Sequence, residues 1–117
     1  MAIPKEIQGQ NYISLVTLRK NGAEVKTPVW FAEEGGKLYV MTRSDSGKYK
    51  RIRNNPQVKL APCTMGGKIT GPEFCGTARV LPEAQWVEAK KALHRKYWLS
   101  RLPFWSKKNV FVEIAMA

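Results

Sequence analysis

The chain has 117 residues, of which 44% are hydrophobic and 25% charged, as is typical of a folded domain and not of a disordered segment. Twenty Lys and Arg residues stand against nine Asp and Glu, so the formal net charge is +11. No apolar run approaches the roughly 20 residues of a membrane span, and the first residues, MAIPK, lack a signal-peptide core. We therefore expect a single domain over residues 1–117, no membrane association, a cytoplasmic location, and an anionic partner.

The N-terminal part predicts three strands joined by short turns. Residues 11–18 (NYISLVTL) are rich in β-branched and aromatic side chains, and the Asn-Gly pair that follows is a strong hairpin signal. A second strand covers residues 24–32 and contains Pro28, which cannot donate a ladder hydrogen bond and therefore favours a sheet edge or a bulge. A third strand over residues 37–42 would complete an antiparallel meander.

Two helices are expected among the remaining strands. A polar loop precedes a short helix over residues 48–55, which Pro56 ends. Pro82 is well placed as the first residue of a longer helix with an apolar stripe. Further strands are expected over residues 58–63, 74–81 and 109–117. Six short strands with two inserted helices predict a mainly β fold, a small and partly open barrel.

The residues that usually carry metal sites or side-chain catalysis are too few. Cys63, Cys75 and the only histidine, His94, cannot supply a closed tetrahedral zinc site, so we predict no metal. His94 lies on a Lys-rich helix without a carboxylate to orient it, so we predict no catalytic side chain. We expect free thiols in the cytosol, although the two cysteines would lie near each other if their strands paired symmetrically.

A candidate anion site lies at the start of the first predicted helix. Thr42, Ser44 and Ser46 supply hydroxyls just before the helix, whose free N–H groups favour negative charge. Lys48 and Arg51 are three residues apart and project from the same side of the helix. From composition alone, these groups are either a cradle for a phosphate group or a solvated helix face with an ordinary cap.

Four segments, in order, resemble the pyridoxamine 5′-phosphate oxidase-like split-barrel superfamily: YISLVTLRKNG, TPVWF, LYVMTRSDSGKYKRIRNNPQVKLAPCT and TGPEFCGTARVLP. The most specific part is the T-x-x-x-S-G-K-x-x-R-x-x-x-N-P run, which an A-P-C-T strand follows. The likeness extends over residues 10–98 and is greatest to the branch of deazaflavin (coenzyme F420)-dependent oxidoreductases. The carboxyl end, residues 99–108, departs from the family's pattern.

This resemblance implies a six-stranded split barrel that forms a homodimer, with cofactor sites in the clefts between the subunits. The cofactor phosphate would be held by Thr42, Ser46, Lys48 and Arg51, with Ser44 in the same loop. The ring would lie beside Thr27, Pro28, Val29 and Trp30. Trp98 or Trp105 of the partner subunit could complete the site.

The resemblance also implies an oxidoreductase that transfers a hydride between a flavin-type cofactor and a small organic substrate. The cofactor carries the chemistry in such an enzyme, so no catalytic histidine is needed. We favour coenzyme F420 over FMN, because its phosphodiester and polyglutamate tail suit a cationic surface, to which Lys50, Arg53, Lys68, Lys90 and Lys91 contribute.

Two alternatives remain. The chain could bind the cofactor without turnover, as a carrier or sequestering protein. It could also be a nucleic-acid-binding β-barrel with stacking aromatic residues. The second alternative is disfavoured, because the basic residues cluster on the helices and do not alternate with aromatic residues on one strand face.

Overall fold

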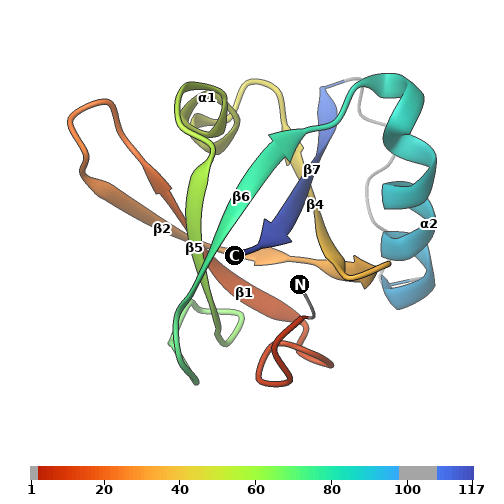
Figure 1. Cartoon of the computed structure of the whole chain (residues 1–117), viewed down its shortest axis with the longest axis horizontal. Coiled ribbons are helices and arrows are strands. Elements are labelled where there is room, and N and C mark those ends of the chain that lie inside the picture. Colours follow the sequence, from red (N-terminus) through yellow and green to blue (C-terminus); the bar gives the residue numbers. More distant parts are fainter. Residues whose placement is uncertain (1–2, 98–107) are drawn as a thin grey trace.

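The computed structural model describes residues 3–97 and 108–117. These residues form one strongly curved antiparallel sheet with two α-helices outside it (Figure 1). The helices are α1 (Gly47–Asn54) and α2 (Trp86–Tyr97), and a 3₁₀ turn, η1 (Glu83–Gln85), precedes α2. The strands are β1 (Tyr12–Leu18), β2 (Glu24–Trp30), β3 (Ala32–Glu34), β4 (Lys37–Arg43), β5 (Gln57–Pro62), β6 (Phe74–Val80) and β7 (Asn109–Met116).

The strand order in the sheet is β2-β1-β5-β6-β7-β4-β3. The predicted mainly β split barrel with two helices is therefore confirmed, with seven strands in place of six. The predicted strand over residues 24–32 is two strands, because β2 pairs with β1 at one sheet edge whereas β3 pairs with β4 at the other. The chain changes edge at the fully buried Phe31. The predicted meander is wrong for the same reason, and Pro28 lies on an edge strand as expected.

Apolar side chains from the strands fill the inside of the curved sheet. Ile52 of α1 and two isoleucines of the N-terminal turn, Ile3 and Ile7, pack into the same cluster. The strand residues of this cluster include Ile13, Leu15, Val29, Leu38, Val40, Leu60, Val112 and Ile114. Burial of so many apolar groups from distant segments is what closes the sheet around one core.

Helix α2 covers the outer face of β4 and β7 (Figure 1). Ala89 and Leu93, two residues of the predicted apolar stripe, are buried there with Tyr39 of β4 and Phe111 of β7. The helix begins later than predicted, because Pro82 caps the 3₁₀ turn and the α-helical hydrogen bonding starts at Trp86. Neither helix in the described part of the chain has the length and apolar character needed to cross a bilayer.

A buried carboxylate joins three strands on this outer face. The register places Glu113 of β7 between Arg79 of β6 and Tyr39 of β4. Its oxygens accept hydrogen bonds from Arg79 Nη2 at 3.2 Å, Lys37 Nζ at 3.3 Å and Tyr39 Oη at 3.4 Å. Glu113 is therefore a satisfied structural charge.

The two cysteines are free, as expected; Cys63 is buried and Cys75 is exposed. The symmetric strand pairing that would bring them near each other does not occur. Cys75 lies opposite Lys59 in the β5–β6 pair, whereas Cys63 forms an isolated bridge with Ile69. The long β5–β6 loop shifts the register by several residues from the symmetric pairing.

Candidate functional site

A pocket of about 300 Å³ opens beside the place where the chain passes from β2 to β3. Four elements supply its walls. The end of β2 and the end of β4 face each other, the start of α1 closes one side, and α2 contributes one side chain. The lining residues are Pro28, Val29, Trp30, Met41, Thr42, Arg43, Ser46, Lys48 and Leu93.

The pocket brings together two groups of predicted residues that lie apart in the sequence. Pro28, Val29 and Trp30 line it from β2, and Thr42, Ser46 and Lys48 line it from β4 and α1. The remaining predicted residues, Thr27, Ser44 and Arg51, do not line it, and Trp98 and Trp105 lie outside the described residues.

Three lining residues were missed by sequence reasoning: Met41, Arg43 and Leu93. Met41 and Arg43 flank the predicted Thr42 on β4, so their proximity to the site could have been read from the sequence. Leu93 belongs to the apolar stripe of α2 and carries no signal that separates a pocket wall from core.

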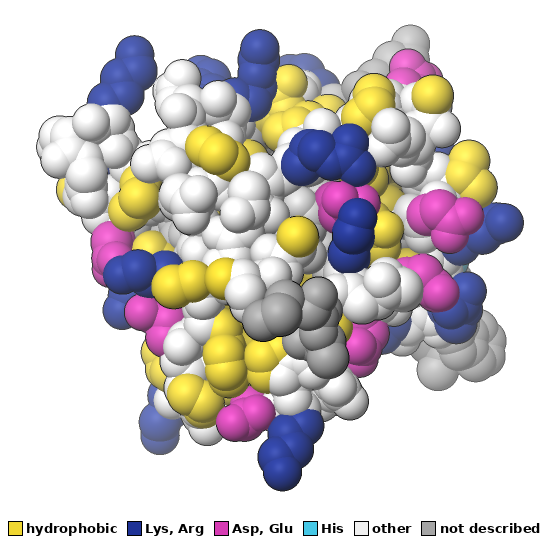
Figure 2. Space-filling view, in the orientation of Figure 1, with side chains coloured by type: hydrophobic (Ala, Val, Ile, Leu, Met, Phe, Trp, Pro, Cys, Tyr) yellow, Lys and Arg dark blue, Asp and Glu magenta, His cyan; other side chains and the backbone are white. Residues whose placement is uncertain are grey.

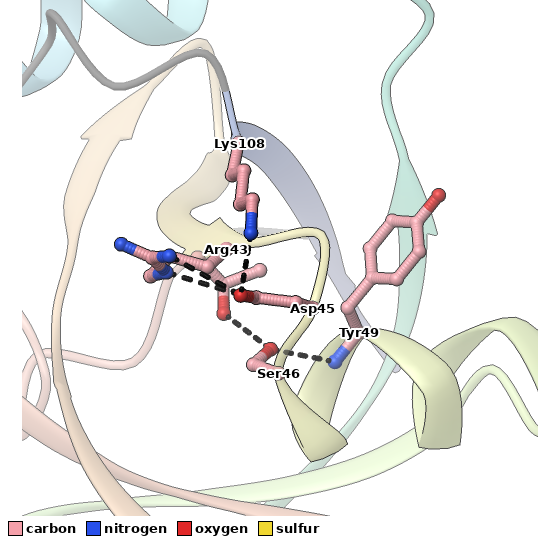
Figure 3. A network of polar contacts seen from close by, with 6 residues as sticks. Arg43, Asp45, Ser46, Tyr49 and Lys108 are labelled. Carbon is pink, nitrogen blue, oxygen red and sulfur yellow. Dashed lines mark hydrogen bonds and ion pairs between the residues drawn. The ribbon is translucent and has the colours of Figure 1, made fainter.

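Two hydroxyls, one at the end of β4 and one on the bend before α1, line the pocket. Figure 3 shows the Ser46 hydroxyl at the start of α1. Ser46 caps α1, and its Oγ accepts a hydrogen bond from the backbone N–H of Tyr49 at 3.2 Å. The same Oγ lies 3.1 Å from Oγ1 of Thr42, which is only 7% exposed. Each hydroxyl carries one hydrogen, and the contact between the two uses one of them. No other oxygen in the described part of the chain accepts a hydrogen bond from these two hydroxyls, so the second hydrogen is available to a ligand oxygen.

An ion-pair network fixes the same bend (Figure 3). Arg43 donates to both carboxylate oxygens of Asp45, at 3.0 and 3.2 Å, and Lys108 Nζ lies 3.4 Å from the same carboxylate. The hydrogen bond from Arg43 is the main reason that the pKa of Asp45 is lowered to about 2. Asp45 thus compensates the charge of Arg43.

The cations of α1 have no such compensation. Lys48 is half-buried, and its pKa is lowered by burial and by the nearby charge of Arg51. The pKa of Arg51 is lowered by burial and by Arg19. In the described part of the chain, no carboxylate pairs with Lys48 or Arg51, and the first turn of α1 holds no acidic residue. The start of α1 is therefore a region of positive potential next to the pocket.

The opposite wall is apolar and aromatic. Val29 is buried and Trp30 half-buried, and the Trp30 ring packs against the ring of Tyr12 at a centroid distance of 6.3 Å. Such a pocket can hold a molecule with a flat apolar part and an anionic part. Within the described residues, no three His, Cys, Asp or Glu side chains gather closely enough to hold a metal ion.

A curved antiparallel sheet closed by a chain that changes edge, with α1 at one end, defines the class of small split β-barrels. The family model for pyridoxamine 5′-phosphate oxidase matches residues 2–117. The chain therefore belongs to this family.

Solved structures agree with the fold at low sequence identity. The protein Atu2129 from Agrobacterium tumefaciens, of unknown function, has a TM-score of 0.78 and 12% identity over 92% of this chain, which spans 48% of that protein. An F420 reductase has a TM-score of 0.70 and 21% identity over 98% of this chain and 96% of its own. The heme storage protein HutZ from Vibrio cholerae has a TM-score of 0.68 and 12% identity over 94% of this chain and 84% of its own. No curated protein matched the sequence.

Proposed function

We propose that this chain is an oxidoreductase that binds coenzyme F420, in preference to FMN, and passes a hydride between the cofactor and a small organic substrate. The observation that carries the proposal is the pocket itself, which joins the uncompensated cation Lys48 and a free hydroxyl hydrogen to an aromatic wall. Family membership and the shared fold of an F420 reductase support it.

The residues present fit such a cofactor. Lys48 and the Thr42–Ser46 hydroxyl pair would hold the phosphate, and each charge-assisted contact is worth about 1.5–3 kcal/mol. The apolar wall of β2, with Val29 and Trp30, would hold the ring and exclude water from one side. The cofactor supplies the hydride chemistry when bound.

A cationic surface beyond the phosphate contact favours coenzyme F420 over FMN. On the exposed side of α1, Lys50, Arg53 and Asn54 line an open depression of about 380 Å³. These side chains project from the side of α1 opposite to Lys48, so only a ligand with a long tail that passes around the helix would contact both the pocket and the depression. The acidic tail of coenzyme F420 would gain from these cations, whereas FMN has no group to place there.

The proposal includes a homodimer and a cytoplasmic protein. The pocket is open on one side, and a second copy would cover it. Trp98 of the partner subunit would then complete the wall, in keeping with the family resemblance. Size-exclusion chromatography with light scattering measures the assembly, and a monomer at micromolar concentration would contradict this part.

Fluorescence titration with coenzyme F420 and with FMN tests the binding site. We expect Lys48→Ala combined with Arg51→Ala to weaken F420 binding by well over tenfold, given about 1.5–3 kcal/mol for each charged contact. The matched control is Lys5→Ala with Lys20→Ala, which removes the same charge from exposed positions outside the pocket. Failure of the wild-type chain to bind either cofactor would overturn the proposal.

A carrier function is the second candidate. It is favoured by the pocket lining, which among residues 3–97 and 108–117 holds no carboxylate, histidine or tyrosine that could transfer a proton. A heme storage protein also shares the fold. Stopped-flow absorbance of the F420-loaded protein with candidate acceptors separates the two, because an oxidoreductase bleaches or restores the cofactor band and a carrier leaves it unchanged.

Nucleic-acid binding receives no support from the visible surface. On the face that Figure 2 shows, Lys and Arg side chains are scattered around the outline and near the middle, separated by acidic, polar and apolar surface. Retention on single-stranded DNA that falls steeply with salt would speak for it.

A further inference from the structure

The guanidinium group of Arg51 lies in an electrostatically unfavourable place. Its Nη1 is 2.6 Å from the position that a Cβ atom on Gly47 would take, so it lies against the first residue of α1. The N-terminus of a helix carries partial positive charge, which disfavours a cation there. Besides burial, the charge of Arg51 lowers the pKa of Lys48, and the charge of Arg19 lowers the pKa of Arg51, so the three cations repel one another. Without an anion, the arrangement opposes folding, so specific contacts must hold the guanidinium in place.

One contact comes from the buried end of β1. Arg51 Nε donates a hydrogen bond to Thr17 Oγ1 at 2.6 Å. Thr17 lies on β1, which is paired on one side with β2 and on the other with β5, and the residue is 0% exposed. A buried hydroxyl on a strand with two partners is a rigid acceptor. In the described part of the chain, no hydrogen bond engages the η nitrogens, which therefore remain available to a ligand.

The second contact is the packing of the Arg51 guanidinium against Gly47, in the space that a side chain at this position would fill. The backbone does not require glycine here, because Gly47 is not among the residues with positive φ. The space beside its Cα is instead filled by the Arg51 guanidinium. An alanine would force this guanidinium to move, and the backbone could stay where it is, because the obstructing atoms are the end of a flexible side chain.

We propose that Thr17 and Gly47 are positioning residues that hold the Arg51 guanidinium beside Lys48 before the ligand binds. Thr17 anchors Nε from β1, and Gly47 leaves room for the η nitrogens at the residue between Ser46 and Lys48. Ser46 and Lys48 line the pocket, and the Arg51 guanidinium lies behind them at its edge. The second cation of the anion site is then in place at no further ordering cost. This inference rests on the proposed binding of a phosphorylated cofactor at this pocket.

A ligand-free measurement tests the holding contact by itself. The ¹H–¹⁵N signal of Arg51 Nε–H, identified by its loss in Arg51→Lys, should exchange slowly with water in the wild-type chain. Thr17→Val removes the acceptor with little change in volume, and should speed exchange by about tenfold or more, since a charged hydrogen bond of this kind is worth about 1.5 kcal/mol. Thr17→Ser keeps a hydroxyl and should retain slow exchange. Equal exchange in Thr17→Val and the wild type would overturn the inference, whatever the ligand does.

Titration with coenzyme F420 tests the consequence for binding. Thr17→Val and Gly47→Ala should each weaken affinity by about tenfold, the equivalent of one charged contact, whereas Thr17→Ser should bind within about twofold of the wild type. Gly66→Ala is the matched control, because an added Cβ there meets only Thr64 Oγ1 at 3.9 Å. Unchanged affinity in both Thr17→Val and Gly47→Ala would overturn the positioning role.

The two failures can be told apart. If the wild type binds neither F420 nor FMN while the Arg51 Nε–H signal behaves as expected, the proposed cofactor is wrong and the holding contact stands. Inorganic pyrophosphate then serves as the anion, and movement of the Arg51 signal on its addition measures binding directly. If Thr17→Val does not fold, Gly47→Ala still decides the question, because its obstruction falls on a side-chain end.

Discussion

Lys48 is a position where binding and stability should respond in opposite directions. It lies in the first turn of α1, and its lowered pKa means that the folded chain holds the ammonium proton less tightly than the unfolded chain does. Its charge therefore destabilises the ligand-free fold at neutral pH. A cation at a helix N-terminus costs about 0.3–1 kcal/mol and a like charge three residues away about 0.2–0.5 kcal/mol. Lys48→Gln should thus raise the free energy of unfolding by about 0.5–1.5 kcal/mol.

Two measurements on the same variant check this sign. Calorimetry of the ligand-free chain should show a melting temperature higher by about 2–6 °C, and F420 titration should show affinity lower by at least about tenfold. Lys20→Gln removes the same charge from the exposed β1–β2 turn and should change neither quantity. An unchanged or lower melting temperature for Lys48→Gln would refute the reasoning, because it would mean that the charge of Lys48 does not oppose folding. An unchanged affinity would also refute it, because it would mean that Lys48 does not contact the ligand.

The bend, the thiols and the sheet give three more expected outcomes. The hydrogen bond from Arg43 lowers the pKa of Asp45 to about 2, so the ion pair persists as the pH falls below the usual aspartate range and is lost only near pH 2. The carboxyl ¹³C signal of Asp45 should therefore titrate near pH 2, and a midpoint near pH 4 would contradict this prediction. Exposed Cys75 should react with a thiol reagent at least about tenfold faster than buried Cys63, because burial raises the pKa of the Cys63 thiol. If the fast phase of the reaction had the same rate in Cys75→Ser as in the wild type, this prediction would be wrong. Gly76→Ala should lower stability to urea by about 1–3 kcal/mol, since its Cβ would lie 3.0 Å from a backbone oxygen of β7; unaltered unfolding would show that the sheet can yield.

Most of the fold could be predicted because its signals are local. The Asn-Gly turn, the cap at Ser46 and the alternation of the last strand each depend on a few neighbouring residues, and β1, α1 and β7 lie where these signals place them. The break at Phe31 could not be predicted, because residues 28–32 (PVWFA) form a continuous apolar run with no glycine or polar turn residue to mark a break. Only the choice of pairing partner changes there, and pairing depends on residues far away in the sequence.

The candidate site divides in the same way. The helix start, with Ser46 and Lys48, carries its chemistry within a few residues, so its part in a pocket could be anticipated. The contact between Arg51 and Thr17 joins residues 34 positions apart, and Leu93 reaches the pocket from α2. Neither is visible in a pattern, because both result from how the helices pack on the sheet.

The distribution of charge gives the anion site a reason beyond solubility. Acidic residues in the described part of the chain form ion pairs on the strands, on the bend before α1 and on α2, with Lys37, Arg43, Lys59, Arg79, Arg95 and Lys108. Helix α1 carries Lys48, Lys50, Arg51 and Arg53, has no acidic residue, and is absent from these pairs. If the +11 charge served solubility alone, cations would avoid the positive end of a helix, where they oppose folding. Lys48 and the guanidinium group of Arg51 nevertheless lie at that end of α1, next to a pocket with an aromatic wall. This is what a site for an anionic ligand requires, because the ligand supplies the negative charge that the chain withholds.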